Sequence, residues 1–305
     1  MLRLSLHKEL HMRSADALRL AALASLWGGS FLFMRIAAPE LGAAWVAFGR
    51  VLIAAILLLI YAKIRGVDLQ LRRFYKEYLV LGFFQSALPF FLFATAETKI
   101  SAGLGSILNA TSSLFGLIIA MMIGDEKVRI DRILGIFVGI AGVAILAGFD
   151  VGILDVAIVG AIACCLGAAC SYGISSNYTR RYVNGAPSLG MAAFSQTAAV
   201  LWLLPLAILY PPSGTVGSDA IVAVTLLGVL ATGIAYILFF RLVVDVGPVV
   251  SLTVTFLVPI MAFLWGALFL NEQITLITIV GGGVVLLGTA LTIGIEKLRP
   301  QPRLT

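Results

Sequence analysis

Polar and aromatic side chains inside long apolar stretches are the residues of this sequence best suited to bind a small solute. The candidates are Trp27, Ser30, Arg50, Gln85, Asn109, Thr111, Ser171, Tyr172, Ser175, Tyr236 and Thr255. All except Arg50 are uncharged, and they offer hydrogen bonds or aromatic faces. With Trp202 as a further aromatic wall, they predict a cavity suited to a small zwitterion with a variable side chain.

A structural role competes with this interpretation at each position. Ser and Thr hydroxyls inside helices also bond the carbonyls of their own helix or bridge to the next helix. Aromatic side chains also pack in helix interiors or collect at membrane interfaces. Spacing favours a shared site in one helix, because Ser106, Asn109 and Ser113 follow one another at three and four residues and so lie on one face.

Arg50 is the candidate with the most specific chemistry. An arginine inside an apolar span is costly, and it indicates a functional site unless it is paired. Two roles remain open for it. Its guanidinium could clamp the carboxylate of a substrate, or it could pair with Glu97.

Chemistry that the sequence lacks narrows the function further. Both histidines, His7 and His11, lie in the N-terminal tail, and the three cysteines lie together in one apolar run at residues 164–170. An intramembrane protease or acyltransferase needs a nucleophile with a base, or a set of metal ligands. We therefore expect neither an enzyme nor a metal or other cofactor. The Gly281–Gly283 run has no lysine after it, which excludes a phosphate-binding loop.

Acidic residues are also scarce in the apolar stretches. Only Glu97 approaches mid-depth, and proton-driven carriers commonly use an intramembrane Asp or Glu. We therefore expect gradient-driven, facilitated movement with weak or no proton coupling.

The elements that must position these residues are membrane helices. Hydrophobic residues make up 61% of the 305 residues and charged residues 12%, against roughly 45–50% and about 25% in soluble domains. A span needs about 20 apolar residues, so the chain has room for ten. The predicted spans are residues 17–37, 43–62, 78–97, 101–123, 132–149, 155–177, 188–210, 219–240, 247–269 and 275–295.

The basic residues predict the orientation of these spans. With both termini in the cytoplasm, all but three of the 21 Lys and Arg residues fall in cytoplasmic segments, the exceptions being Arg35, Arg50 and Lys99. This distribution follows the positive-inside rule. The net charge of +6 therefore reports topology and not a nucleic-acid partner. The cytoplasmic tails are residues 1–16 and 296–305.

An internal repeat predicts two halves, at residues 17–150 and 151–295. A shift of 146 residues lays Ser101 to Gly148 over Gly247 to Gly294 and places Glu126 on Glu272. Five helices per half would invert the second half in the membrane. Glycines in the fifth and tenth helices suit close helix packing or a homodimer contact. They are Gly135, Gly139, Gly281 and Gly288.

The chain resembles the EamA-type, ten-helix branch of the drug/metabolite transporter superfamily. The resemblance rests on residues 27–31 (WGGSF), Arg50, and the acidic turns at residues 124–126 (GDE) and 270–272 (LNE). It covers nearly the whole chain and is strongest, around Leu108 to Glu126, toward YddG-type amino-acid exporters. A proline in the fourth and ninth helices of the family is present as Pro259 only, because its counterpart is Ser113.

The resemblance and the residues together predict an all-α exporter in the bacterial inner membrane. It would move small metabolites, amino acids foremost and aromatic or apolar ones among them, by alternating access, with Pro89 and Pro259 as hinges. Export of drugs or nucleotide-related metabolites is an alternative, although an interior with few charges disfavours polyanions. A receptor or assembly protein that transports nothing is a second alternative.

Overall fold

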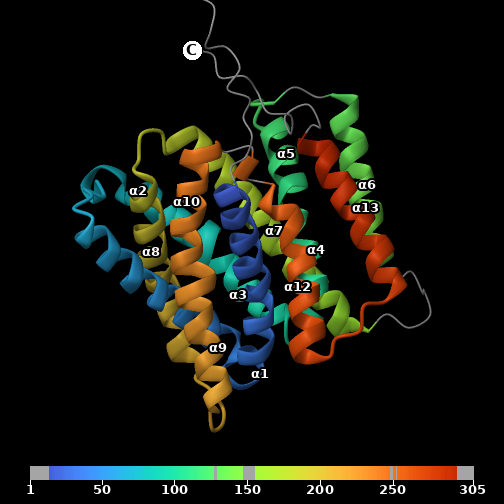
Figure 1. The fold of residues 1–305 in the computed structure, drawn as a ribbon, viewed down its shortest axis with the longest axis horizontal. Coiled ribbons are helices and arrows are strands. Elements are labelled where there is room, and N and C mark those ends of the chain that lie inside the picture. Colours follow the sequence, from blue (N-terminus) through green and yellow to red (C-terminus); the bar gives the residue numbers. More distant parts are fainter. Residues whose placement is uncertain (1–13, 127–128, 147–154, 248–249, 252, 294–305) are drawn as a thin grey trace, which may run out of the picture.

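Helices make up all the regular structure in the part of the chain that is described. The computed structural model describes residues 14–126, 129–146, 155–247, 250–251 and 253–293. The helices stand side by side as a bundle (Figure 1). In the first part of the chain they are α1 (Ser14–Ile64), α2 (Leu71–Leu81), the π-helix η1 (Gly82–Ala87), α3 (Leu88–Ala96), α4 (Ala102–Ala110), α5 (Ser112–Met122) and α6 (Ile130–Leu146).

The second part of the chain repeats this alternation of helices and short connections. Its elements are α7 (Val156–Tyr182), α8 (Ser188–Leu209), α9 (Ser218–Gly228), the π-helix η2 (Val229–Ile234), α10 (Ala235–Val246), α12 (Val254–Leu270) and α13 (Leu276–Ile293). Within the described residues, six continuous helical stretches are long and apolar enough to cross a membrane, and three shorter apolar helices accompany them. The chain is therefore a multi-helix membrane protein.

The first stretch, α1, contains two of the predicted spans. Its 51 residues would extend about 75 Å as one straight helix, more than twice the roughly 30 Å of a bilayer core. Gly42 breaks the helical path with φ 74° and ψ 154°, a conformation that glycine adopts without steric cost. The break at Gly42 falls in the connection predicted between the spans 17–37 and 43–62, although Pro39 and Glu40 in that connection are helical.

Several helices extend beyond their predicted apolar windows. The third begins at Leu71 and not at residue 78, the sixth continues to Tyr182, and the eighth continues to Val246. Their extra turns carry exposed polar residues such as Arg72 and Arg241, which hydropathy does not count as helix. The predicted ends at residues 149 and 295 lie outside the described residues, as does part of the predicted start of the ninth span.

Two helices are interrupted where the sequence predicts continuous ones. The predicted span 101–123 divides at Thr111 into α4 and α5. The π-helices η1 and η2 interrupt the third and eighth stretches. A π segment accommodates an extra residue per turn and is frequent at functional sites. The sequence analysis did not predict either one.

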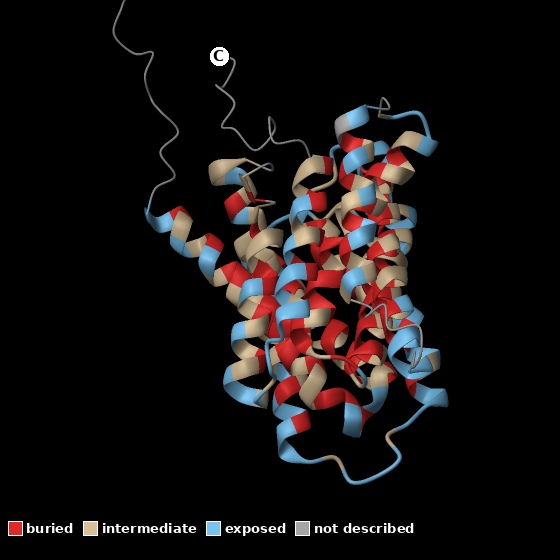
Figure 2. Ribbon diagram, turned by 90° about the vertical axis from the view of Figure 1, so that its right-hand side faces the viewer, coloured by how far each residue is buried: buried red, intermediate tan, exposed pale blue. Residues whose placement is uncertain are grey.

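Buried residues form the inside of the bundle, and exposed residues lie on its outside (Figure 2). Many of the exposed residues are large and apolar. Phe137 is 66% exposed, Leu276 74% and Leu209 70%. Soluble proteins rarely expose apolar surface on this scale. Lipid would cover these side chains, so the surface agrees with the composition.

The glycines of α6 and α13 pack against each other within one chain. A Cβ on Gly288 would collide with Gly139 N and come 2.7 Å from Gly135 O. A Cβ on Gly281 would come 2.8 Å from Leu146 Cγ. The glycine faces of α6 and α13 are therefore occupied by a contact within the chain. A homodimer through the outer faces of these two helices stays a prediction.

Candidate functional site

Arg50 lies buried at the centre of a group of side chains from several helices. It is 6% exposed, and its Nε donates a hydrogen bond to Thr232 Oγ1 of η2 at 2.8 Å. Its guanidinium carbon lies 3.6 Å from the centroid of the Phe90 ring, a cation–π contact. Its Nη1 is 3.9 Å from Met34 Sδ. A hydroxyl, a ring and a thioether thus surround the cation.

No carboxylate pairs with Arg50 among the described residues. The alternative pairing with Glu97 is wrong, because neither Glu97 carboxyl oxygen has a hydrogen-bond partner and Arg50 bonds Thr232. A buried charge normally has an opposite charge beside it. The guanidinium is therefore free to bind an anionic group from outside the chain.

A second polar group, around Gln85 of η1, lies beside the arginine. Gln85 Nε2 donates to the Tyr236 hydroxyl at 3.5 Å, and Ser175 Oγ donates to Gln85 Oε1 at 3.4 Å. Tyr172 and Tyr236 lie close enough to Arg50 to interact electrostatically with its guanidinium. The structure therefore brings together five of the predicted residues: Arg50, Gln85, Tyr172, Ser175 and Tyr236.

The π-helices provide the positions from which these side chains meet. Gln85 belongs to η1 and Thr232 to η2. Thr232 Oγ1 also donates to Leu227 O, five residues earlier, at 2.9 Å. Thr232 is a polar residue inside the predicted span 219–240, but it was not among the site residues selected from the sequence. Its one signal was a polar residue between Ala231 and Gly233 in an apolar run.

Two bonds near η1 serve structure more directly. Ser171 Oγ donates to Phe84 O at 2.7 Å, so this predicted site residue ties α7 to the π-helix. Gln196 Nε2 donates to Ser86 Oγ at 2.8 Å. Each bond pairs a buried donor, although Gln196 Oε1 has no hydrogen-bond partner among the described residues.

Three of the remaining predicted site residues make the following contacts. Thr111 Oγ1 donates to Leu108 O of its own helix at 2.6 Å, and Asn109 Oδ1 accepts a bond from Ser112 Oγ at 3.4 Å. Trp27 packs on Phe239 with ring centroids 5.4 Å apart. Two more belong to α1 and α12, namely Ser30, which is buried, and Thr255, which is half-buried.

The aromatic wall predicted at Trp202 is wrong. Trp202 is 48% exposed, and its Nε1 donates to Leu79 O at 3.1 Å. Together with Phe83 and Phe84 it borders an apolar surface groove of about 290 Å³. Its side chain therefore faces the surroundings of the bundle and not the Arg50 group.

The two predicted hinge prolines stand next to irregular backbone or inside a helix. Pro89 is at the start of α3, directly after η1. Pro259 lies inside α12. A proline inside a helix removes one backbone hydrogen bond. Both positions can therefore bend, and their hinge role stays a prediction.

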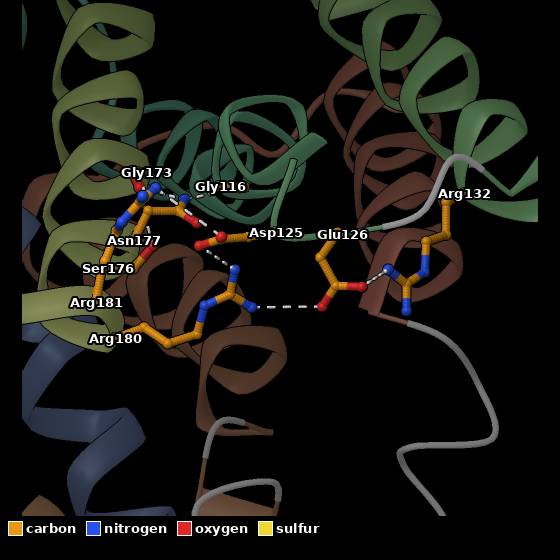
Figure 3. A network of polar contacts seen from close by, with 9 residues as sticks. All are labelled: Gly116, Asp125, Glu126, Arg132, Gly173, Ser176, Asn177, Arg180 and Arg181. Atoms are coloured by element: carbon orange, nitrogen blue, oxygen red, sulfur yellow. Dashed lines mark hydrogen bonds and ion pairs between the residues drawn. The ribbon is translucent and has the colours of Figure 1, made fainter. Parts of the chain in front are cut away.

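Ion pairs join the helices at one end of the bundle (Figure 3). Arg180 of α7 lies 3.1 Å from Asp125 Oδ2 and 3.4 Å from Glu126 Oε1. Glu126 also pairs with Arg132 of α6 at 2.6 Å. Asn177 Nδ2 donates to Gly116 O of α5 at 2.8 Å. The acidic turn after α5 is thus tied to α6 and α7.

We expect the two arginines of this network to differ in their effect on stability. Arg180→Gln should lower the free energy of unfolding by less than about 1 kcal/mol, because exposed pairs contribute little. Arg132→Gln should cost more, because Arg132 is 7% exposed and its pair with Glu126, at 2.6 Å, is both shorter and more buried than the pairs of Arg180. Thermal unfolding in detergent measures both. Equal losses, or a larger loss for Arg180→Gln, would contradict the assignment.

Comparison with known proteins agrees with the helical architecture. The model of the EamA-like transporter family matches residues 17–148 and again residues 159–294. The uncharacterized transporter YvbV of Bacillus subtilis is 25% identical over 95% of this chain and 94% of its own length. An uncharacterized transporter of Archaeoglobus fulgidus is 22% identical over 90% and 97%.

One solved crystal structure shares the fold. It superimposes with a TM-score of 0.64 at 18% identity, over 94% of this chain and 100% of that chain. Because the family model matches two long segments that together span most of the sequence, the chain belongs to the EamA-like transporter family of membrane transporters.

Proposed function

We propose that this protein exports small metabolites, amino acids foremost, across a bacterial inner membrane by alternating access. The observation that carries the proposal is Arg50, a buried guanidinium with no carboxylate partner among the described residues and with neutral hydrogen-bonding groups beside it. Such a cation suits the carboxylate of a substrate.

The groups beside Arg50 favour a small monocarboxylate over other solutes. Gln85 and Tyr236 offer both donors and acceptors, so they suit the ammonium group and the polar edge of an amino acid. Phe90 provides an apolar surface for aromatic or apolar side chains. One cation cannot neutralise the several charges of a nucleotide, so nucleotide-related metabolites are the weaker alternative, together with drugs.

Two inverted five-helix halves are part of the proposal. The double match of the family model supports them. So do the π-helices, since η2 begins at Val229, 147 residues after η1 begins at Gly82. The bonds to these segments also correspond: Arg50 of α1 reaches η2, and Gln196 of α8 reaches η1. Arg50 and Gln196 are 146 residues apart, the shift that relates the sequence halves.

Corresponding glycine contacts support the same arrangement. Gly28 of α1 lies against Met261 and Ala262 of α12, where a Cβ would come 2.8 Å from Ala262 N. Gly173 of α7 lies against α5 in the same way, 2.8 Å from Gly116 N. Each contact joins one half to the other. The proposed ten spans and cytoplasmic termini follow from this symmetry and from the charge distribution.

Corresponding ion pairs at the two ends of the bundle support alternating access. Arg180 of α7 pairs with Glu126 after α5. At the other end, Arg35 of α1 lies 3.7 Å from Glu272 Oε1, after α12. Each pair connects the proposed halves, so opening one end would separate one pair while the other holds.

Flux measurements test the proposed function. The purified protein is reconstituted in liposomes and offered a panel of radiolabelled amino acids and nucleosides. We expect uptake of amino acids with apolar or aromatic side chains and none of nucleosides. Uptake of nucleosides alone would favour the alternative substrates. Absence of flux for the whole panel and for cationic dyes would favour a receptor or assembly protein.

Thr232→Val should weaken transport, because it removes a hydrogen bond that positions Arg50. Valine keeps the shape but removes the acceptor of the Arg50 Nε bond, and hydrogen bonds to charged groups contribute about 1.5–3 kcal/mol. We expect the KM for the best amino acid to rise on the order of tenfold. Thr225→Val is the matched control, because Thr225 is exposed in the same helical stretch and bonds only Ile221 O. Equal KM values for both variants would remove Thr232 from the site.

A further inference from the structure

A buried carboxyl group without a partner lies near the end of the bundle at which α12 connects to α13 (Figure 1). Glu97 directly follows the last residue of α3 and is 0% exposed. Neither of its carboxyl oxygens has a hydrogen-bond partner in the described part of the chain. A buried carboxylate in this state is strongly unfavourable, so its protonation state requires an explanation.

Groups from four elements surround this carboxyl. Arg35 of α1 donates Nη1 to the backbone carbonyl of Glu97 at 2.6 Å, not to its side chain. Glu272, after α12, and Cys165 of α7 are the other titratable groups that act on it. The helix α4 contributes Gly105, where a Cβ would collide with Glu97 Oε1. Arg35 therefore lies near two carboxyl groups, those of Glu97 and Glu272.

Of these two carboxyl groups, the one that pairs with Arg35 is that of Glu272. Its Oε1 lies 3.7 Å from Arg35 Nε, and the Ala102 N–H at the start of α4 donates to both of its oxygens at 3.2 Å. These contacts give the Glu272 carboxyl group a cationic neighbour and a backbone donor. A second ionised carboxyl close to the first is disfavoured.

The pKa of Glu97 reflects this arrangement. Burial raises the pKa of the Glu97 carboxyl well above its ordinary range, the Glu272 carboxylate raises it further, and Arg35 opposes the rise. On the same connection, Lys99 is exposed.

We propose that Glu97 is a proton-binding site, which holds this end of the bundle closed while its carboxyl is protonated and loses the proton when the end opens to water. The proposal rests on the alternating access proposed above. It differs from the sequence expectation, which was that transport has weak or no proton coupling.

The direction of the pH effect follows from linkage. In the closed end the pKa is raised, whereas a solvated Glu has a pKa of about 4.3. Closure is therefore fully favoured below the solvated pKa, and this advantage is lost as the pH rises through the closed-state pKa. Between the two values, each unit of pH should favour opening about tenfold, because one proton leaves on opening.

Distances between two spin labels measure this opening without any substrate. Cys164, Cys165 and Cys170 are replaced by alanine, and labels are attached to cysteines at Lys99 and Gln273, both exposed at this end. The full-length protein is studied in lipid nanodiscs from acid to alkaline pH by pulsed electron resonance. Variants are Glu97→Gln, which stays neutral, and Glu40→Gln, which changes an exposed acid that bonds Gly217 N.

We expect the long-distance population to grow with pH in the parent and in Glu40→Gln, and to stay small at every pH in Glu97→Gln. Leucine counterflow in liposomes is measured on the same variants. A pH-independent distance distribution in the parent, or the same pH response in Glu97→Gln, would overturn the proton site. Absence of counterflow together with a Glu97-dependent opening would overturn the proposed substrate and leave the proton site standing.

Discussion

Replacing Arg50 with methionine should remove transport while leaving the fold as stable as before, or more stable. The guanidinium has no carboxylate partner among the described residues, so its burial is costly without a substrate. Replacing buried ionic groups with apolar ones of similar volume often stabilises proteins, by about 1–4 kcal/mol. A residue kept despite such a cost serves function, because activity and stability commonly trade off.

The expected loss of transport is large. Truncating one partner of a buried, hydrogen-bonded charge pair costs about 2–5 kcal/mol, or roughly 30-fold to several thousandfold in the specificity constant. Amino-acid uptake by reconstituted protein gives this ratio, and thermal unfolding in detergent gives the stability.

Arg50→Lys is the matched control for the charge. Lysine keeps the positive charge but loses the planar fork and the Nε bond to Thr232, so we expect partial activity. If Arg50→Met unfolds readily while its folded fraction transports normally, the arginine holds the helices together and does not bind substrate.

Gly288→Ala should destabilise the protein more than any other single methyl group added to α13. The new Cβ would collide with Gly139 N and lie 2.6 Å from Gly139 Cα and 2.7 Å from Gly135 O. These are backbone atoms, so α6 and α13 must separate. Overpacking of this kind costs about 1–3 kcal/mol, and in lipid the lost contact is the main attraction between helices.

Gly283→Ala provides the control within the same helix. Gly283 is exposed, and nothing lies within 4 Å of a Cβ built on it. Alanine has the higher helix propensity, by about 1 kcal/mol, so this variant should be unchanged or slightly more stable. Thermal unfolding followed by tryptophan fluorescence compares the two. Similar unfolding temperatures for both would show that α6 and α13 do not depend on this contact.

Hydropathy predicted the helices well where their apolar windows are complete, and poorly where polar residues begin or end them. The predicted span 188–210 agrees with α8 to within one residue. The third stretch was predicted seven residues too short, because Arg72 and Arg73 face away from the core on an amphipathic turn. A sum of apolarity along the chain cannot include such a turn.

The site was predicted only in part, for a related reason. Four other predicted residues meet around Arg50, because polar groups in apolar spans are few and tend to face one another. Trp202 was assigned to the cavity wrongly, and the contacts of Thr111 do not support its assignment there. Thr111 satisfies its own helix, and Trp202 faces outward. Residue type alone does not reveal which face of a helix is buried.

The sequence by itself predicted that this chain is a helical membrane protein and that Arg50 is a charged residue within an apolar span. Both conclusions follow from local composition, since the cost of moving each side chain out of water depends mainly on its type. Only the tertiary structure decided that Thr232 accepts from Arg50 and that η1 and η2 bring Gln85 and Thr232 inward. It also decided that the Glu97 carboxyl has no hydrogen-bond partner among the described residues. These outcomes depend on how helices rotate and cross, which is set by packing between residues far apart in the chain.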